Sequence, residues 1–331
     1  MAISLKNIAQ ALNLSKTTVS WILSGQGETK GFSKSTIKLV KQYAVKVNYR
    51  PNRLARSLST GSTYTLGLIL PSIGDTYFAQ MALAIEAEAE KRNYVLTICS
   101  SKGDSRREMM LIRTLREKQV DGLIIVPAGI TFNGIKTLLN DNFPFVLVDR
   151  SFPQIKANSI LVDDFAGSYR LTESLIAKGC RNIAYISTDV HLSVMKLRNN
   201  GYLKALEDHG LSFDCSLYVE VEKYIYNDEF EKKMKKLFSI SKLDAIFFST
   251  HHLSYGVIKY LNQNKIPFLN QLEIASFHSN IVLELLFPNL STVVIPIDEV
   301  GRKAVEILLK NIANPKIEKE EIVLELLYQC G

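Results

Sequence analysis

The chain has 331 residues, of which 47% are hydrophobic and 22% charged, and its formal net charge at neutral pH is +7. No apolar run approaches the roughly twenty residues that a membrane-spanning helix needs, and the first ten residues lack the apolar core of a signal peptide. The four cysteines are scattered, which argues against a disulfide-stabilised secreted scaffold. We therefore expect a cytoplasmic protein with reduced thiols.

The positive charge is concentrated in the first sixty residues, which hold ten lysines and arginines and one acidic residue, Glu28. That segment carries +9, so the rest of the chain carries −2. A compact basic unit followed by a larger, nearly neutral body is typical of a nucleic-acid-binding domain joined to a separate functional module.

Three short helices are predicted in the basic segment. Ser4 is a suitable N-cap for the first, a turn follows at residues 13–14, Ser15 precedes a second helix over residues 16–23, and Ser33 opens a third. The apolar positions expected to form the core are Leu5, Ile8, Ala9, Leu12, Val19, Ile22, Leu23, Ile37, Val40, Tyr43 and Ala44. This pattern is typical of a helix-turn-helix domain, whose second helix reads the major groove.

From about residue 63 onward, β-rich runs alternate with amphipathic stretches. Strands are expected at 66–70, 95–99, 122–126, 145–148, 183–186, 245–248 and 274–277, separated by helices that include 79–91, 167–178 and 298–310. Apolar strands alternating with helices indicate parallel sheets covered on both faces. The segments that begin at Val120 and Leu243 look alike, and about 270 residues are too many for one core. We therefore predict an α/β body with two similar lobes.

Seven sequence blocks stand in the order found in one protein family. They are SLKNIAQA at 4–11, SKTTVS at 15–20, NYRPNRLARSL at 48–58, VDGLII at 120–125, VDR at 148–150, VDDFAG at 162–167 and LSTV at 290–293. On these blocks the chain resembles the lactose/galactose repressor family of bacterial transcriptional regulators over nearly its whole length.

The resemblance implies a domain plan. A helix-turn-helix DNA-binding domain would occupy residues 1–50, a hinge helix and linker 51–62, and a two-lobed, periplasmic-binding-protein-like domain for effector binding and dimerisation 63–331. The first lobe would comprise about 63–162 and 293–320, and the second about 163–292 and 321–331. Asp163 and Asp164 are then read as a helix start at the lobe crossover, not as an acid/base pair.

The resemblance also implies which residues contact DNA. The major-groove readers fall on Lys16, Thr17 and Trp21, with Thr18 and Ser20 placed for phosphates and Ser4 at the start of the first helix. In the hinge, the implied minor-groove residues are Asn52, Ala55, Arg56 and Leu58, of which Leu58 would wedge between base pairs. Three alternatives stay open: Trp21 is partly buried in the domain, Lys16 contacts only phosphate, and Leu54 and Leu58 merely dock the linker on the body.

Parallel sheets place ligands beyond the carboxyl ends of their strands. Residues that follow the predicted strands, matched to the family, give the expected effector site: Ser72, Asp75, Tyr77, Phe78, Arg150, Arg198, His251 and His278. The two histidines stand where many relatives carry aspartate, so the donor-rich set suggests an anionic effector, a sugar acid or sugar phosphate. The alternative is a neutral sugar beside neutral histidines. A metal cluster of His251, His252 and His278 is disfavoured, because their spacing is irregular and no cysteine lies near them in the sequence.

The sequence holds no common catalytic motif, so we expect neither an enzyme nor a cofactor. Because a short reading helix contacts few base pairs, we expect a homodimer, joined through the helix at 79–91. The resemblance implies a transcriptional regulator, a repressor, whose affinity for double-stranded operator DNA is controlled by a sugar-type effector. One alternative is control by a protein partner such as a phosphocarrier protein. A more remote alternative, a sugar-binding transport protein, leaves the basic segment unexplained.

Overall fold

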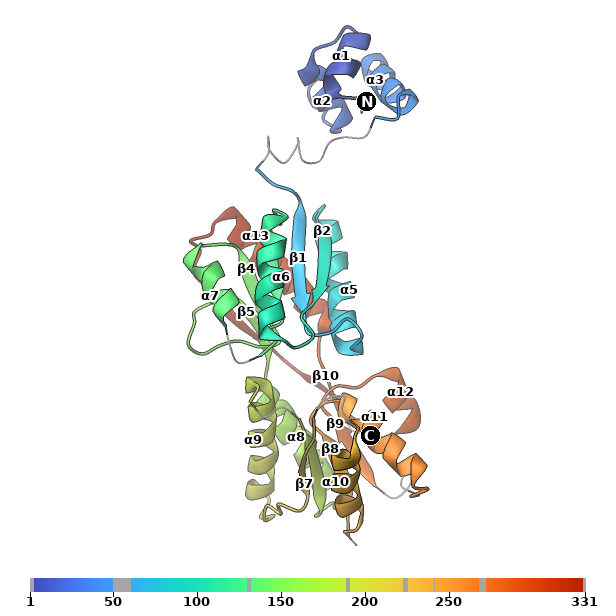
Figure 1. Cartoon of the computed structure of the whole chain (residues 1–331), viewed down its shortest axis with the longest axis vertical. Helices are drawn as coiled ribbons and strands as arrows, with labels where there is room; N and C mark the ends of the chain where they lie inside the picture. Colours follow the sequence, from blue (N-terminus) through green and yellow to red (C-terminus); the bar gives the residue numbers. More distant parts are fainter. Residues whose placement is uncertain are drawn as a thin grey trace. The chain divides into compact units, whose positions relative to one another are not determined.

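The computed structural model describes residues 3–49, 61–129, 132–188, 191–222, 226–240, 242–267 and 272–329. The chain divides into two compact units, residues 1–63 and residues 64–331, which are described separately (Figure 1). Within the described residues, no helix combines the length and apolar character needed to cross a membrane.

The first unit contains three helices: α1 (Leu5–Ala11), α2 (Lys16–Leu23) and α3 (Lys34–Lys46). Their N-caps are the serines expected from the sequence, because the hydroxyls of Ser4, Ser15 and Ser33 each accept a backbone N–H from the first turn. The buried core consists of Ile8, Ala9, Val19, Ile22, Val40 and Ala44. The predicted three-helix fold is confirmed.

The turn between α1 and α2 has a backbone conformation that suits its sequence. Asn13 has a φ of 51°, in the left-handed region that asparagine tolerates better than most residues. The next residue, Leu14, donates its N–H to the carbonyl of Ala9 at 2.9 Å and so closes the end of α1. This turn sets the angle at which α2 leaves α1.

The first lobe of the second unit is built on a six-stranded sheet in the order β11-β5-β4-β3-β1-β2. Its strands are β1 (Thr65–Leu70), β2 (Val95–Ser100), β3 (Gly122–Ile125), β4 (Phe145–Val148), β5 (Ser159–Val162) and β11 (Glu321–Leu324). Its helices are α5 (Thr76–Lys91), α6 (Ser105–Glu117), α7 (Asn133–Asn140) and α13 (Ile297–Ala313). Buried residues of α5 and α13 pack with one face of the sheet and those of α6 and α7 with the other (Figure 1).

The second lobe repeats this plan with the strand order β12-β10-β9-β8-β6-β7. Its strands are β6 (Ile183–Ser187), β7 (Tyr218–Glu220), β8 (Ala245–Phe248), β9 (Glu273–Ser276), β10 (Ser291–Val294) and β12 (Leu327–Gln329). Its helices are α8 (Asp164–Ala177), α9 (Ser193–Asp208), α10 (Asp228–Phe238), α11 (His252–Gln263) and α12 (Ile281–Leu286). The pairings are parallel except that β12 runs antiparallel to β10.

The two segments that look alike in sequence occupy equivalent positions in the two sheets. β3 lies between β4 and β1, and β8 lies between β9 and β6. The aspartate before each strand binds the chain that enters the neighbouring strand: Asp121 accepts the N–H of Tyr64, and Asp244 accepts those of Arg181 and Asn182. The internal similarity therefore reflects one structural element that is used twice.

The chain crosses between the lobes three times: after β5, after β10 and after β11. The expected assignment of residues 321–331 to the second lobe is wrong for β11, which pairs with β5 in the first sheet. The apolar run that starts at Ile322 resembles one strand in sequence, but it supplies an edge strand to each lobe, with the crossing at residues 325–326. Similarly, β10 stays in the second sheet up to Val294, two residues beyond the expected boundary.

Two glycines allow close helix packing in the body. A Cβ at Gly301 of α13 would lie 2.7 Å from the backbone carbon of Ala84 in α5, and one at Gly201 of α9 would lie 2.3 Å from the backbone oxygen of Phe165 in α8. Neither backbone could accept a larger residue without moving. The α8–α9 contact matters for the site, because both helices begin at the cleft between the lobes.

Candidate functional site

The exposed face of α2 carries the side chains expected to read DNA. Lys16, Thr17 and Ser20 are exposed, whereas Val19 and Ile22 of the same helix are buried. Thr18 is half-buried, and its hydroxyl hydrogen-bonds that of Ser15 at 2.8 Å. Thr18 therefore supports the N-cap of α2 as well as lying beside its exposed face.

Trp21 is held by its neighbours but not enclosed. Its ring centroid lies 6.2 Å from that of Phe32, and the Lys30 ammonium is 5.1 Å from the ring centroid. The side chain still exposes 37% of its surface. The indole can therefore pack in the domain and present one edge to a ligand, so both readings of this residue remain compatible with the structure.

The remaining expected DNA contacts divide into two groups. Ser4 is exposed, and its hydroxyl is used in a reciprocal capping box with Asn7. The four hinge residues, Asn52, Ala55, Arg56 and Leu58, lie outside the described residues.

A small cavity lies between the two lobes of the body, at the carboxyl ends of their strands. Its volume is about 40 Å³, which is room for a few water molecules. The residues that line it are Asp75, Tyr77, Phe78, Asp149, Arg150, Thr188, Leu192, Val194, Met195, Arg198, Thr250, His251 and His278. Seven of the eight residues expected to bind an effector are among them. The eighth, Ser72, is not, and its hydroxyl accepts the N–H of Gly74.

Arg198, near the start of α9, is buried and fully engaged. Its Nε forms an ion pair with Asp164 at 2.7 Å, its Nη1 donates to the carbonyl of Ser249, and its guanidinium lies 3.7 Å from the ring centroid of Phe277. Burial raises the pKa of Asp164 to about 6, and the arginine opposes that rise. The pair therefore places the Arg198 guanidinium at the cleft. Its partner, the Asp164 carboxyl, is costly to ionise because it is buried.

Arg198 also fixes the state of His278. Its Nη2 lies 3.3 Å from Nε2 of His278. Because a guanidinium can only donate, this contact makes Nε2 the acceptor and leaves the imidazole proton on Nδ1.

Arg150, on the first lobe, is held in a similar way. Its Nε lies 3.2 Å from a carboxylate oxygen of Asp149, and its Nη1 donates to the carbonyl of Pro127. The next residue of that loop, Ala128, donates its N–H to Glu108 at 2.6 Å. Burial raises the pKa of Glu108 to about 7, while the Ala128 N–H and the charge of Arg150 oppose the rise.

Tyr77 contacts both lobes. Its hydroxyl donates to Asp149 at 2.9 Å within the first lobe, and its ring stacks on His278 of the second with centroids 4.3 Å apart. Burial, followed by the negative charge of Asp149, holds the pKa of the phenol well above its usual value, so it remains a donor. Asp149 and His278 both have a φ of 70°. Left-handed backbone at non-glycine residues is costly and concentrates at functional sites.

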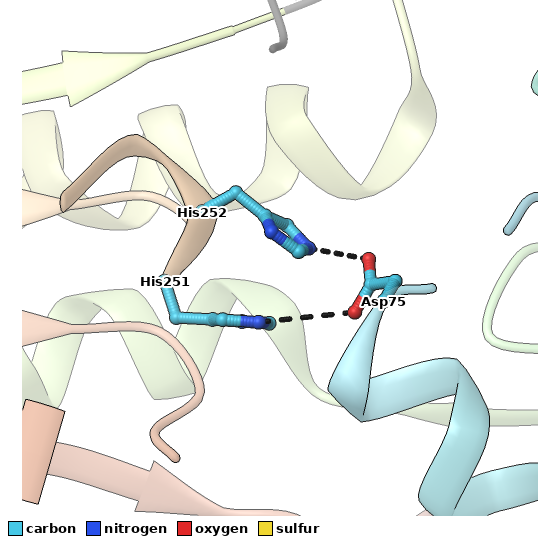
Figure 2. Close-up of side chains that lie close together, drawn as sticks. All are labelled: Asp75, His251 and His252. Carbon is cyan, nitrogen blue, oxygen red and sulfur yellow. Dashed lines mark hydrogen bonds and ion pairs between the residues drawn. The ribbon is translucent and has the colours of Figure 1, made fainter. Parts of the chain in front are cut away.

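A second contact between the lobes joins Asp75 to two histidines (Figure 2). Asp75 is the N-cap of α5 and accepts the N–H of Tyr77, while His251 and His252 open α11 in the other lobe. Nε2 of His252 hydrogen-bonds one oxygen of Asp75, and Nε2 of His251 lies 3.7 Å from the other. His251 also approaches the hydroxyl of Thr76 at 3.2 Å. All three are buried.

Known proteins are similar to this chain in fold and over nearly its full length. Residues 172–328 match the family model described as a periplasmic binding protein-like domain. Catabolite control protein A of Priestia megaterium is 28% identical over 325 residues, covering 98% of this chain and 97% of the relative. The ribose operon repressor of Haemophilus influenzae is 29% identical over 326 residues, covering 97% and 96%. The solved transcription regulator CcpA of Lactococcus lactis superposes with a TM-score of 0.71 at 25% identity, covering 80% of this chain and 97% of that one.

Over nearly its whole length the chain is therefore similar to transcriptional regulators of the lactose/galactose repressor family. The curated relatives cover 97–98% of the chain, so the similarity extends through both units. The relatives are transcriptional regulators and not enzymes.

Several lining residues were not among those that the resemblance indicates. Asp149 directly follows the predicted strand 145–148, and Thr188 and Thr250 lie two residues beyond 183–186 and 245–248, so strand ends mark all three although the resemblance assigns them no role. Leu192, Val194 and Met195 carry no such signal, because they lie where α9 begins. Asp164 was recognised only as part of a helix start; Asp163 does cap α8, but Asp164 also binds Arg198, and that pairing depends on the approach of α8 to α9.

Proposed function

We propose that this protein is an operator-binding transcriptional regulator, acting in the cytoplasm, whose DNA affinity is controlled by a small carbohydrate-type effector bound between the lobes. The observation that carries this proposal is the cleft itself, because strand ends from both lobes supply polar side chains to one small cavity. Such a cavity suits a ligand whose binding changes the relation of the lobes.

The DNA-binding part of the proposal rests on charge and exposure. The first sixty residues carry +9, and the exposed residues of α2 combine a cation with hydroxyls that can donate to or accept from bases. In this proposal Lys16, Thr17 and Trp21 face the major groove, and Thr18 and Ser20 face phosphates. The hinge residues would add minor-groove contacts.

The charges in the cleft favour a neutral sugar over an anion. Arg150 already faces Asp149, and Arg198 already faces Asp164, while Asp75 adds a third carboxylate. An anionic effector would have to compete with these carboxylates for both guanidinium groups. Sugar hydroxyls can instead donate to the carboxylates and accept from the arginines, while Tyr77 and Phe78 offer aromatic faces to the ring.

The cavity is too small for a sugar in the arrangement described. Its volume of about 40 Å³ compares with roughly 300–1,000 Å³ for typical small-molecule sites. We therefore propose that effector binding separates the Tyr77 and His278 rings and opens the lobes. An effector that binds the open arrangement more tightly would shift the body toward it.

We propose a homodimer, since two reading helices are needed to recognise a pair of half-sites. α5 buries one face in its own lobe but exposes Leu83, and the edge strand β2 exposes Val95 and Ile98. Analytical ultracentrifugation of the Leu83→Glu variant tests this surface. A loss of the dimer supports it, and an unchanged dimer contradicts it.

The deciding experiment is operator selection with the full chain, with and without a pooled metabolite extract. Recovery of a palindromic site whose occupancy changes with the extract supports the proposal. Calorimetry then compares neutral sugars with their uronate, aldonate and phosphate counterparts. Binding confined to the anions would contradict the neutral assignment without affecting the regulator function, whereas failure to select any DNA site would contradict the function itself.

Control by a protein partner is the second candidate, because catabolite control protein A is among the full-length relatives. A pull-down with a phosphocarrier protein, in its phosphorylated and unphosphorylated forms, distinguishes the two. Stoichiometric binding of the phosphocarrier protein that alters operator affinity would favour control by a protein partner. Absence of such binding would favour control by a metabolite.

A further inference from the structure

Asp75, His251 and His252 form a cluster of potential metal ligands. One potential ligand atom from each residue lies within 4.8 Å of the others. Figure 2 shows both imidazoles directing Nε2 toward the same carboxylate, which comes from the opposite lobe. Nε2 of His251 lies 3.7 Å from one Asp75 oxygen, near the roughly 3.3 Å between two ligands of a tetrahedral zinc ion, whereas Nε2 of His252 hydrogen-bonds the other oxygen, so a bound metal would replace that hydrogen bond.

The donor types indicate which class of metal would bind. Two imidazole nitrogens with one carboxylate oxygen suit zinc and neighbouring transition metals, whereas magnesium and calcium prefer oxygen ligands throughout. A set of two histidines and one acidic residue leaves at least one coordination position for water or a solute. Asp75 and His251 also line the cavity between the lobes, so an open position would face that cavity.

Burial strengthens the argument. The exposed fractions of Asp75, His251 and His252 are 3%, 1% and 5%. A buried carboxylate is costly unless a positive charge compensates it, and a divalent cation between these three ligands would supply that charge. The neighbouring N–H of Tyr77 already holds Asp75 in place, so the carboxylate is oriented before any metal arrives.

We propose that Asp75, His251 and His252 form a binding site for a divalent transition metal, of which zinc fits the ligands best, and that the metal bridges the two lobes. Asp75 caps α5 of the first lobe and the histidines begin α11 of the second, so metal binding requires the lobes to be closed. The metal therefore stabilises the closed body. The metal site shares Asp75 and His251 with the proposed effector cavity, but its test measures metal binding alone and does not require the proposed regulator function.

Cobalt(II) titration of the chelator-stripped full-length protein is the test, because tetrahedral cobalt reports its ligands through visible absorption. We expect one cobalt per chain, displaced by zinc. The Asp75→Asn and His252→Gln variants should bind at least about tenfold more weakly. His209→Gln is the matched control, since His209 lies 3.7 Å from Glu173 on the surface and offers an ordinary histidine–carboxylate pair. It should titrate like the wild type.

A second measurement guards against variants that do not fold. Asparagine can still cap α5, so Asp75→Asn should keep its urea transition without metal. Zinc, but not magnesium, should raise the midpoint of the wild type and of His209→Gln, and should leave that of Asp75→Asn unchanged. Absence of saturable cobalt binding by the wild type would overturn the proposal, as would equal binding by the wild type and Asp75→Asn. Either result would assign the cluster to a hydrogen-bonded contact between the lobes.

Discussion

The ring of Tyr77 stacks on the imidazole of His278 across the cleft, with centroids 4.3 Å apart and planes inclined by 27°. Each partner is held from its own side: the Tyr77 hydroxyl donates to Asp149, and His278 accepts from Arg198. The stack therefore connects two hydrogen-bonded networks that belong to different lobes. Any ligand that enters the cavity has to separate the rings or fit beside them.

A double-mutant cycle measures this contact. Tyr77→Ala and His278→Ala should each lower the free energy of unfolding, and their effects should not add, with a coupling energy of roughly 0.5–1.5 kcal/mol. Urea denaturation of the wild type, both single variants and the double variant gives this energy. The control cycle pairs Tyr77→Ala with His209→Ala, which lies at the far end of α9 and should show no coupling. Additivity in the first cycle would mean that the stack contributes nothing.

The buried pair of Asp164 and Arg198 should be sensitive to the loss of one partner. Asp164→Asn leaves the guanidinium buried beside a neutral group, so we expect a loss of about 3–5 kcal/mol in the free energy of unfolding at pH 7. Replacing both residues together, with Asp164→Leu and Arg198→Met, should cost less than the single change, because no unpaired charge remains.

Urea denaturation of the three proteins tests the order of these effects. Glu117→Gln is the control, since Glu117 and Arg113 form a surface pair on α6 with side chains 62% and 82% exposed. It should leave the urea midpoint unchanged. If Asp164→Asn were as stable as the wild type, the carboxylate would contribute nothing to holding Arg198.

Glu108 should make the stability of the body depend on pH. Burial raises its pKa from 4.5 to about 7 in the folded chain. Between these values the folded state holds a proton that the unfolded state has released, so stability falls as the pH rises from about 4.5 to 7 and is then constant.

The Glu108→Gln variant carries no ionisable group at this position and can still accept the N–H of Ala128. Relative to the wild type, it should gain on the order of 1–3 kcal/mol between pH 5 and pH 8. Urea midpoints across this range measure the effect, and Glu117→Gln again serves as the exposed control. A curve for Glu108→Gln parallel to that of the wild type would show that Glu108 ionises normally.

Local patterns were sufficient to predict most of the elements. Serine caps and apolar spacing identified the three helices of the first unit, and continuous apolar runs identified seven strands of the body within a residue or two. β5, β7 and β10 were missed. The division of the last apolar run between two sheets could not be predicted either, since the pairing partners of an edge strand lie far away in sequence.

The site was predictable only in part, for a related physical reason. Strand ends and the family resemblance selected Tyr77, Arg150 and Arg198 correctly as cavity residues. The partners that decide their charge, Asp149 and Asp164, depend on tertiary contacts. The same holds for the closeness of Asp75 to His251 and His252, which are more than 170 positions away in sequence. Irregular spacing in the sequence argued against a metal site. It does not apply to ligands that come from different lobes and approach one another only in the folded chain.

Lys16 provides the sharpest test of how the proposed regulator reads DNA. If its ammonium donates to a guanine, Lys16→Ala should lower affinity for the selected operator and relax the preference at one position by about 1–3 kcal/mol. If it contacts phosphate only, binding to all sequences should weaken alike, and the slope of log K against log salt should become shallower by about 0.9. Lys41→Ala is the control, because it removes the same charge from α3, where Lys41 is exposed. Fluorescence anisotropy on the operator and its single-base variants, at several salt concentrations, separates these cases. A Lys16→Ala protein indistinguishable from the wild type on every sequence would exclude Lys16 as a DNA contact.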